Sequence, residues 1–367
     1  MIGLFDRYAP LGAREALVRE LENCGVDVVV GRECGGTSDR EVVALVGSVS
    51  DEARSLLARS PHVARLYRVS GPWVRTARAF RSTRTVVRIG DASIGAGEPF
   101  VIAGPCSVES PGQIEECARI VVDAGAQALR GGAHKPRTHP YAFQGLGREG
   151  LRLLKRAGDS VGLPVVSEIM DASHARSFVH EGIDCLQIGA RNMQNFTLLK
   201  AVAPTGLPVL LKRGISGTVE EWLCAAEYLA AHGCERVILC ERGIRTYETA
   251  LRNTLDLAVV PLLRRLTHLP VLVDPSHAVG RRDLVGPASR GAIAVGADGL
   301  VLEMHPRPEE ARSDGPQALL PSELAACVAE ANLLARVLPE LEVPAPEGEA
   351  GLAARSMPRT DGPVLAG

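Results

Sequence analysis

The feature that most constrains the fold is a regular alternation, from Phe100 onward, of short apolar runs with amphipathic stretches of helical spacing. Eight runs are expected strands: Phe100–Ala103, Gln127–Arg130, Pro164–Glu168, Asp184–Ile188, Pro208–Lys212, Arg236–Cys240, Pro270–Asp274 and Gly299–Glu303. Strands that alternate with helices indicate a parallel sheet with right-handed crossovers. Eight such units over roughly 220 residues are the size of a closed (β/α)₈ TIM barrel, an α/β fold. An open doubly wound sheet remains the alternative, although no GxGxxG fingerprint opens the first unit.

The rest of the chain divides into three expected parts. Residues 1–70 have the order strand, helix, strand, strand, helix, strand, which is the ferredoxin-like arrangement of a small α+β domain. Residues 71–99 are expected to form a linker and a β-hairpin before the catalytic barrel at 100–340. Residues 341–367 are rich in Pro, Ala and Gly, which predicts a disordered tail. Within the barrel, Leu251–Leu266 is expected to be one long helix.

Charge and cysteine content exclude several classes of protein. A formal net charge of −2 provides no field that would gather nucleic acid or an anionic membrane. No apolar run approaches the roughly 20 residues that span a bilayer, and the amino terminus lacks the basic region of a secretory signal. The nine cysteines form no CxxC pair, which argues against a disulfide scaffold or a zinc ribbon. We therefore expect a cytoplasmic protein.

Cationic side chains follow the expected strands, where barrel enzymes place their active sites. Six of them are expected to converge on one mouth: Arg130, Lys135, Arg137, Arg191, Lys212 and Arg242. Arginine offers a planar fork that suits phosphate and carboxylate groups. Six cations are more than one phosphate needs, so the pattern favours two anionic substrates, or one doubly anionic substrate together with a phosphosugar. Structural ion pairs with Glu168, Glu241 or Asp274 are the competing interpretation for any single cation.

Potential metal ligands gather at strands that become neighbours when the barrel closes. Cys106, His277 and Glu303 follow the first, seventh and eighth strands, and Asp314 lies in the loop after Glu303. A thiolate, an imidazole and two carboxylates suit several divalent first-row metals. For Cys106 alone, a buried core position would be the simpler interpretation; the neighbouring His277 and Glu303 favour the metal site.

Two other functions compete with a metal-dependent synthase. Lys212 ends a barrel strand, where an aldolase could use it as a Schiff-base lysine, which needs its charge suppressed. A phosphometabolite sensor without catalysis is the third interpretation, but a sensor has no need of metal ligands.

At these residues the chain resembles the DAHP synthases, in the branch that carries a ferredoxin-like domain before the barrel. The resemblance covers roughly residues 1–340 and is densest in IAGPCSVES, LRGGAHKPRTHPYAFQGLG, QIGARNMQNF, LLKRG, ILCERGIRTYE, RNTLDLAVVP, VDPSHAVGRRDLV and EMHPRPEEARSDGPQ. It implies a 3-deoxy-7-phosphoheptulonate synthase of the shikimate pathway, which condenses phosphoenolpyruvate with erythrose 4-phosphate.

The resemblance also implies residue roles. Cys106, His277, Glu303 and Asp314 would hold a divalent metal, which could be Mn²⁺, Fe²⁺, Co²⁺ or Zn²⁺. Arg191, Lys212 and Arg242 would bind the phosphate of phosphoenolpyruvate, with Arg130 and Lys135 near its carboxylate. Arg137 and Thr138 would bind the phosphate of erythrose 4-phosphate. Lys135, or His277 through a water molecule, would donate a proton to the new alkoxide; the residues leave both open.

Further expectations concern the sugar, the effector and the assembly. The octulosonate 8-phosphate synthases, which use arabinose 5-phosphate, are the alternative; they carry an Asn-Arg-Ser-type segment where this chain has Pro136-Arg137-Thr138. In relatives, the amino-terminal domain binds aromatic amino acids as feedback control, and a purely structural role is the competing interpretation. The resemblance suggests a homotetramer, with a dimer as the alternative.

Overall fold

The computed structural model describes residues 1–33, 40–69, 71–135, 139–339, 343 and 348–350. Contacts divide the chain into two compact units. The barrel unit comprises residues 84–343, and the small unit comprises residues 1–83 together with the carboxyl-terminal segment from residue 344.

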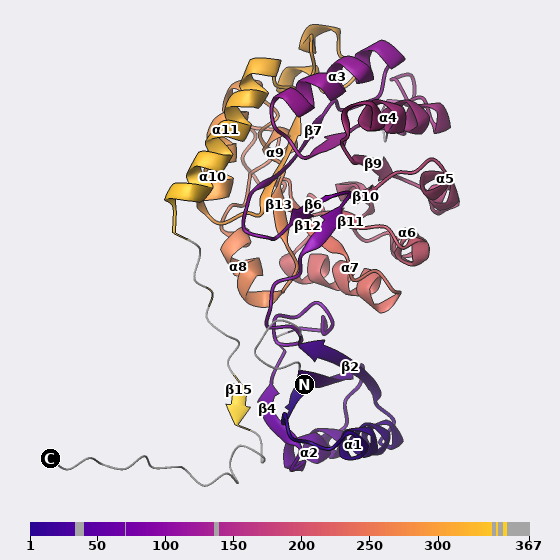
Figure 1. Ribbon diagram of the computed structural model, residues 1–367, viewed down its shortest axis with the longest axis vertical. Coiled ribbons are helices and arrows are strands. Elements are labelled where there is room, and N and C mark those ends of the chain that lie inside the picture. Colours follow the sequence, from indigo (N-terminus) through magenta and orange to yellow (C-terminus); the bar gives the residue numbers. More distant parts are fainter. Residues whose placement is uncertain (34–39, 70, 136–138, 340–342, 344–347, 351–367) are drawn as a thin grey trace, which may run out of the picture. The chain divides into compact units, whose positions relative to one another are not determined.

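Eight parallel strands close into a barrel, which confirms the predicted (β/α)₈ architecture (Figure 1). Around the barrel the order is β10-β11-β12-β13-β14-β7-β8-β9. The strands are β7 (Phe100–Gly104), β8 (Ala128–Arg130), β9 (Val165–Ile169), β10 (Cys185–Ile188), β11 (Val209–Lys212), β12 (Val237–Glu241), β13 (Val271–Val273) and β14 (Gly299–Glu303). Each overlaps the strand expected from the sequence, because a strand that is buried on both faces reads as a short continuous apolar run.

Helices surround this barrel: α3 (Pro111–Asp123), α4 (Arg148–Val161), α5 (Ala175–His180), α6 (Phe196–Val202), α7 (Val219–Ala231), α8 (Val259–Leu266), α9 (Pro275–Val279), α10 (Arg282–Ala294) and α11 (Pro321–Val337). The expectation of one helix over Leu251–Leu266 is wrong, because only its second half, α8, is helical. The first half pairs elsewhere: Thr254 forms a β-bridge with Ile244, and the Asn253 amide donates to the carbonyl of His277. These contacts tie residues 251–254 to the barrel mouth.

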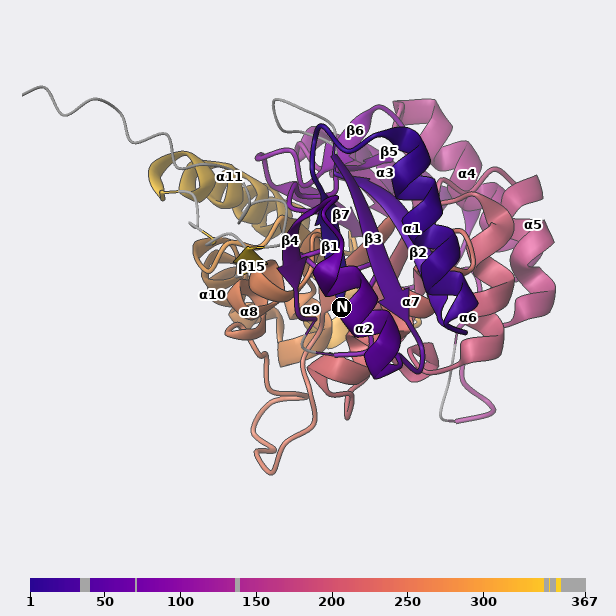
Figure 2. The ribbon, with the colours of Figure 1, turned by 90° about the horizontal axis from the view of Figure 1, so that it is seen from below.

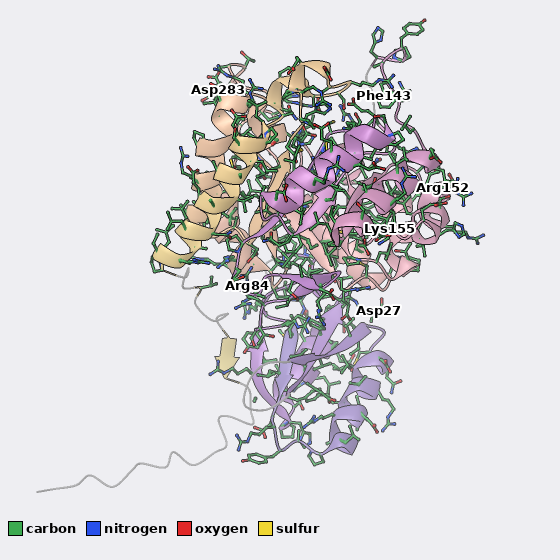
Figure 3. The ribbon with its side chains drawn as sticks, turned by 45° about the horizontal axis from the view of Figure 1, so that its top comes forward. Asp27, Arg84, Phe143, Arg152, Lys155 and Asp283 are labelled. Carbon is green, nitrogen blue, oxygen red and sulfur yellow. The ribbon has the colours of Figure 1, made fainter. Side chains whose placement is uncertain are left out.

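The amino-terminal end of the barrel is plugged by a hairpin. Strands β5 (Val87–Ile89) and β6 (Ala92–Ile94) pair antiparallel, and Val87, Ile89 and Ile94 join the buried core inside the barrel. Arg84, just before the hairpin, forms an ion pair with the buried Asp298. Figure 3 shows Arg84 at this end and Phe143 and Asp283 at the opposite end of the barrel.

The small unit is an antiparallel sheet with two helices on one face (Figures 1 and 2). Its elements are β1 (Ile2–Phe5), α1 (Leu11–Asn23), β2 (Asp27–Glu33), β3 (Arg40–Val46), α2 (Asp51–Arg59) and β4 (Val63–Tyr67). The sheet order is β15-β4-β1-β3-β2, where β15 is Gly348–Ala350, and the six elements from β1 to β4 repeat the expected ferredoxin-like alternation. Leu21, Leu57 and Val43 lie in its core between helices and sheet.

Two segments differ from expectation. Residues 71–83, expected as a linker, belong to the small unit, where the backbone at Gly31 packs closely on the ring of Phe80 and where Trp73 is buried. The carboxyl-terminal segment, expected to be disordered, contains the strand β15 (Gly348–Ala350), which pairs antiparallel with β4. A strand this short owes its structure to the sheet edge on which it pairs, and its own composition does not reveal it. None of the described helices combines the length and apolarity needed to cross a bilayer.

Candidate active site

The polar residues of the barrel mouth are the next inward positions after the apolar core. Alternate side chains of a strand face the same side, so a residue two positions after an inward core residue also faces inward. Ala128, Leu210 and Val301 belong to the barrel core. The corresponding polar residues, one step nearer the carboxyl ends of their strands, are Arg130, Glu168, Gln187, Lys212, Arg242, Asp274 and Glu303.

A glycine at position 104 permits β7 and β8 to approach each other closely at their carboxyl ends. Gly104 has φ +149°, and a β-carbon there would lie 2.1 Å from the carbonyl oxygen of Arg130. That position cannot accept a side chain without moving β8, and Cys106 follows it by two residues.

Cys106, Glu303 and Asp314 bring one ligand atom each within 4.8 Å of one another. The Cys106 Sγ lies 3.3 Å from Asp314 Oδ2. His277 completes the group, its Nε2 lying 3.2 Å from Glu303 Oε1 and 3.9 Å from Asp314 Oδ2. Burial, followed by the charge of Glu303, raises the pKa of the Cys106 thiol to about 12. The raised pKa means that ionising this buried thiol is unfavourable, and a divalent cation that binds the thiolate would offset the cost of ionisation.

Asp314 has an unusual backbone. Its φ of 52° makes it the one non-glycine residue with positive φ in the described part of the chain. Non-glycine residues in this region store strain, which surrounding contacts must maintain. Ser313 supplies one such contact, its Oγ lying 2.6 Å from the Oγ of Ser107, the neighbour of Cys106.

A buried carboxylate orients His277. Asp274 Oδ2 lies 2.7 Å from His277 Nδ1 and also pairs with Lys212 Nζ. Because a carboxylate only accepts, Nδ1 carries the proton and Nε2 presents its lone pair to the cluster. Burial lowers the pKa of His277 despite the nearby Asp274 and Glu303, which keeps the ring neutral. Burial alone would raise the pKa of Asp274, but His277 and Lys212 hold it well below its ordinary value.

Two buried cations lie against the cluster. Lys135 Nζ donates to Cys106 Sγ at 3.0 Å and to the Cys106 carbonyl at 2.9 Å. Burial favours its neutral amine, yet Cys106, which would be negative as a thiolate, and the carboxylate of Glu168 raise the pKa of Lys135. Arg130 Nη1 lies 3.3 Å from Glu303 Oε1.

A cavity of about 310 Å³ opens beside this cluster. Lys135, Lys212, His277 and Asp314 line one part of it, so the cavity and the candidate metal ligands share a wall. Its other charged lining residues are Glu168, Arg191, Arg242 and Arg252. A hollow of this size with five Lys or Arg side chains is suited to small, multiply charged anions.

The structure thus gathers most of the residues singled out in the sequence. Cys106, His277, Glu303 and Asp314 lie together, Lys135, Arg191, Lys212 and Arg242 line the cavity, and Arg130 lies behind Glu303. Arg137 and Thr138 lie outside the described residues.

Three residues of the site were not predicted. Gln187 could have been found by continuing the period-two pattern of its strand from Cys185. Arg252 lies in the segment that helical spacing had assigned to a helix, and Gln317 ends the short 3₁₀ helix Gly315–Gln317 that follows Asp314. No periodic signal marks either one.

Comparisons with known proteins agree with this geometry. A family model described as the DAHP synthetase I family matches residues 79–334. The phospho-2-dehydro-3-deoxyheptonate aldolase of Thermotoga maritima is 50% identical over 285 residues, covering 77% of this chain and 83% of the relative. A 2-dehydro-3-deoxyphosphooctonate aldolase of Geobacter metallireducens is 33% identical over 252 residues, covering 64% of this chain and 91% of the relative.

Solved structures point the same way. The crystal structure of the Thermotoga maritima DAHP synthase matches with a TM-score of 0.72 and 43% identity, over 91% of this chain and 97% of the other. A truncated form of the same organism's 3-deoxy-D-arabino-heptulosonate 7-phosphate synthase matches with a TM-score of 0.68 and 49% identity, over 72% of this chain and 97% of the other. With a family match over most of the chain, a barrel of the same architecture and a mouth of converging cations, this chain belongs to the DAHP synthetase I family.

Proposed function

We propose that this chain condenses phosphoenolpyruvate with D-erythrose 4-phosphate, producing 3-deoxy-D-arabino-heptulosonate 7-phosphate and inorganic phosphate, in a reaction that depends on a divalent metal. The observation that carries the proposal is the cation-lined cavity whose wall includes His277 and Asp314, two of the four clustered candidate metal ligands. The relative with the corresponding name is 50% identical to this chain, whereas the octulosonate relative is 33% identical. That difference favours erythrose 4-phosphate over arabinose 5-phosphate.

The residues present fit a metal. Cys106, His277, Glu303 and Asp314 would hold it, and Glu303 Oε1 is a buried oxygen without a hydrogen-bond partner among the described residues. An orphaned carboxylate oxygen in a group with sulfur and nitrogen donors suits Mn²⁺, Fe²⁺, Co²⁺ or Zn²⁺. When bound, such an ion supplies Lewis-acid polarisation of the aldehyde oxygen.

We assign the phosphate of phosphoenolpyruvate to Arg191, Lys212 and Arg242, which all line the cavity. Its carboxylate is assigned to Lys135 and Arg130. The fixed positive charge of these side chains stabilises negative charge as it moves onto oxygen during the reaction. Lys212 is paired with the buried Asp274, which is the setting of an anion-binding cation rather than of a nucleophilic amine. Borohydride trapping of a carbonyl substrate would reveal the aldolase alternative.

The reaction balances with one water molecule. Carbon 3 of phosphoenolpyruvate attacks the aldehyde carbon and forms the new carbon–carbon bond, while the aldehyde oxygen takes a proton. Water adds at carbon 2, and phosphate leaves by cleavage of the bond between carbon 2 and oxygen. Lys135, protonated and buried beside Cys106, is one proton donor for the new alkoxide. His277, acting through a water molecule, is the other.

Further properties belong to the same proposal. Arg137 and Thr138 bind the phosphate of erythrose 4-phosphate, on the strength of the resemblance. The small unit binds an aromatic amino acid as a feedback effector, and the chain assembles as a homotetramer or a dimer. A cytoplasmic location agrees with the eight described cysteines, which are all free.

Phosphate release tests the function. The purified chain is incubated with phosphoenolpyruvate and either erythrose 4-phosphate or arabinose 5-phosphate, before chelation, after chelation and after Mn²⁺ is returned. Release with erythrose 4-phosphate that disappears on chelation and returns with metal supports the proposal. Preference for arabinose 5-phosphate would assign the chain to the octulosonate branch. A folded, metal-supplied protein that releases no phosphate with either sugar would favour the sensor interpretation.

A further inference from the structure

Gln317 joins the candidate metal site to a cavity-lining arginine. Its amide nitrogen donates to Glu303 Oε2, and its amide oxygen accepts from Arg252 Nη1 at 2.7 Å. Only 3% of Gln317 is exposed, so these two partners replace water for the buried amide. We propose that Gln317, oriented by Arg252, is a positioning residue that selects which oxygen of Glu303 faces the metal ligands. This inference rests on the metal-dependent function proposed above.

The two partners permit one orientation of the amide. A guanidinium group can only donate hydrogen bonds, so the Gln317 oxygen must face Arg252. The ionised carboxylate of Glu303 can only accept, so the Gln317 nitrogen must face Glu303. If the amide flipped, it would place two donors together on one side and two acceptors on the other. Arg252 therefore orients Gln317.

As a consequence, the two carboxylate oxygens of Glu303 have different partners. Oε2 is occupied by Gln317. Oε1 lies 3.2 Å from His277 Nε2 and 3.3 Å from Arg130 Nη1, and it has no hydrogen-bond partner among the described residues. Glu303 thus presents a single oxygen to the candidate ligands and would hold a metal through that one atom.

Backbone contacts fix the position of Arg252. Its N–H donates to the carbonyl of Val279, and a β-carbon at Gly280 would lie 2.6 Å from the Arg252 β-carbon, so the two segments pack without a gap. The same guanidinium lies 3.6 Å from Asp314 Oδ1. Arg252 therefore contacts both a second candidate ligand, Asp314, and the side chain that orients Glu303.

Cobalt binding tests the proposal without turnover. Co²⁺ is titrated into metal-free protein, and the absorption band of cobalt bound to the Cys106 thiolate is followed. We expect Gln317→Met to weaken Co²⁺ binding by about tenfold, the lower end for a side chain that supports a ligand. Gln127→Met is the matched control, because the Gln127 amide also bridges two groups but does so at the start of β7, through the N–H of Val101 and the carbonyl of Gly125. It should leave Co²⁺ binding unchanged.

A second variant tests the role of Arg252. Arg252→Lys retains the positive charge, so a loss of Co²⁺ affinity would report orientation rather than electrostatics. We expect a several-fold loss that disappears when Gln317 is already Met, because both changes act through one amide. If Gln317→Met fails to fold, Arg252→Lys in the folded protein carries the test.

Two results would overturn the inference: Co²⁺ affinity in Arg252→Lys and Gln317→Met within about twofold of wild type, or effects of the two changes that simply add. Phosphate release by the wild-type chain is measured in parallel. A wild type that binds Co²⁺ but releases no phosphate refutes the proposed function, while the binding comparison still decides the role of Gln317.

Discussion

Replacing Asp274 with Asn would remove the charge that joins Lys212, proposed to bind an anion, to His277, proposed to ligate the metal. The Asp274 side chain is fully buried, and it receives Lys212 Nζ and His277 Nδ1 on Oδ2 and the backbone N–H of His277 on Oδ1. An asparagine offers one oxygen and places an NH₂ group at the other position. With the oxygen facing Lys212 and His277 Nδ1, the NH₂ group would meet the backbone N–H of His277, and in either orientation Lys212 is left buried without its counter-charge.

The expected magnitudes follow from this arrangement. Breaking a buried ion pair costs about 3–5 kcal/mol when the remaining charge stays buried. For a domain of this size that corresponds to a melting temperature lower by roughly 10 °C. Loss of the group that fixes the imidazole should also weaken metal binding by about 10–100-fold.

The control is a second buried aspartate in an equivalent setting at the other end of the barrel. Asp298 pairs with Arg84 and Arg264 and accepts the N–H of Val271. Asp298→Asn should lower the melting temperature comparably and leave Co²⁺ affinity and the KM for phosphoenolpyruvate unchanged. Asp274→Asn should alter all three. If Asp274→Asn matched Asp298→Asn in every measurement, Asp274 would stabilise the fold without tuning the site.

Four further substitutions have defined outcomes. Lys135→Met should lower kcat by about 10²-fold or more, since it removes a buried cation and the proposed proton donor; near-normal turnover would exclude Lys135 as the proton donor. Thr218→Ala removes the side chain of the capping box that begins α7, so thermal unfolding should show a loss of about 1 kcal/mol with unchanged kcat. Gly104→Ala should leave little folded protein in circular dichroism, because its β-carbon would meet the Arg130 carbonyl at 2.1 Å. Gly162→Ala, with φ +72° and open space around it, should cost only about 1 kcal/mol.

The sequence was sufficient for the barrel because burial on both faces makes each strand a continuous apolar run. Leu210, Leu272 and Val301 illustrate this, each lying in a run that ends at a polar residue of the mouth. The same periodicity places Lys212 and Glu303 in the mouth, and parallel strands bring their carboxyl ends to one edge.

The loops could not be predicted in the same way. Helical spacing in Leu251–Leu266 was real, but hydrogen bonds from Asn253 and Thr254 to the barrel mouth prevail over it in the first half. Arg252 reaches the site only because of that local structure. Gln317 joins it through partners 14 and 65 positions away, at Glu303 and Arg252, and such pairings leave no local pattern.

The strand β15 changes how the two units are connected. Because it completes the small sheet on β4, the chain passes between the units twice, after residue 83 and before residue 344. In chain order the barrel is an insertion within the small unit. A proteolytic cut after residue 83 would therefore leave residues 1–83 without a covalent link to the barrel and paired through β4 with the β15 that the barrel fragment carries, whereas a cut before residue 344 would leave residues 1–83 covalently joined to the barrel.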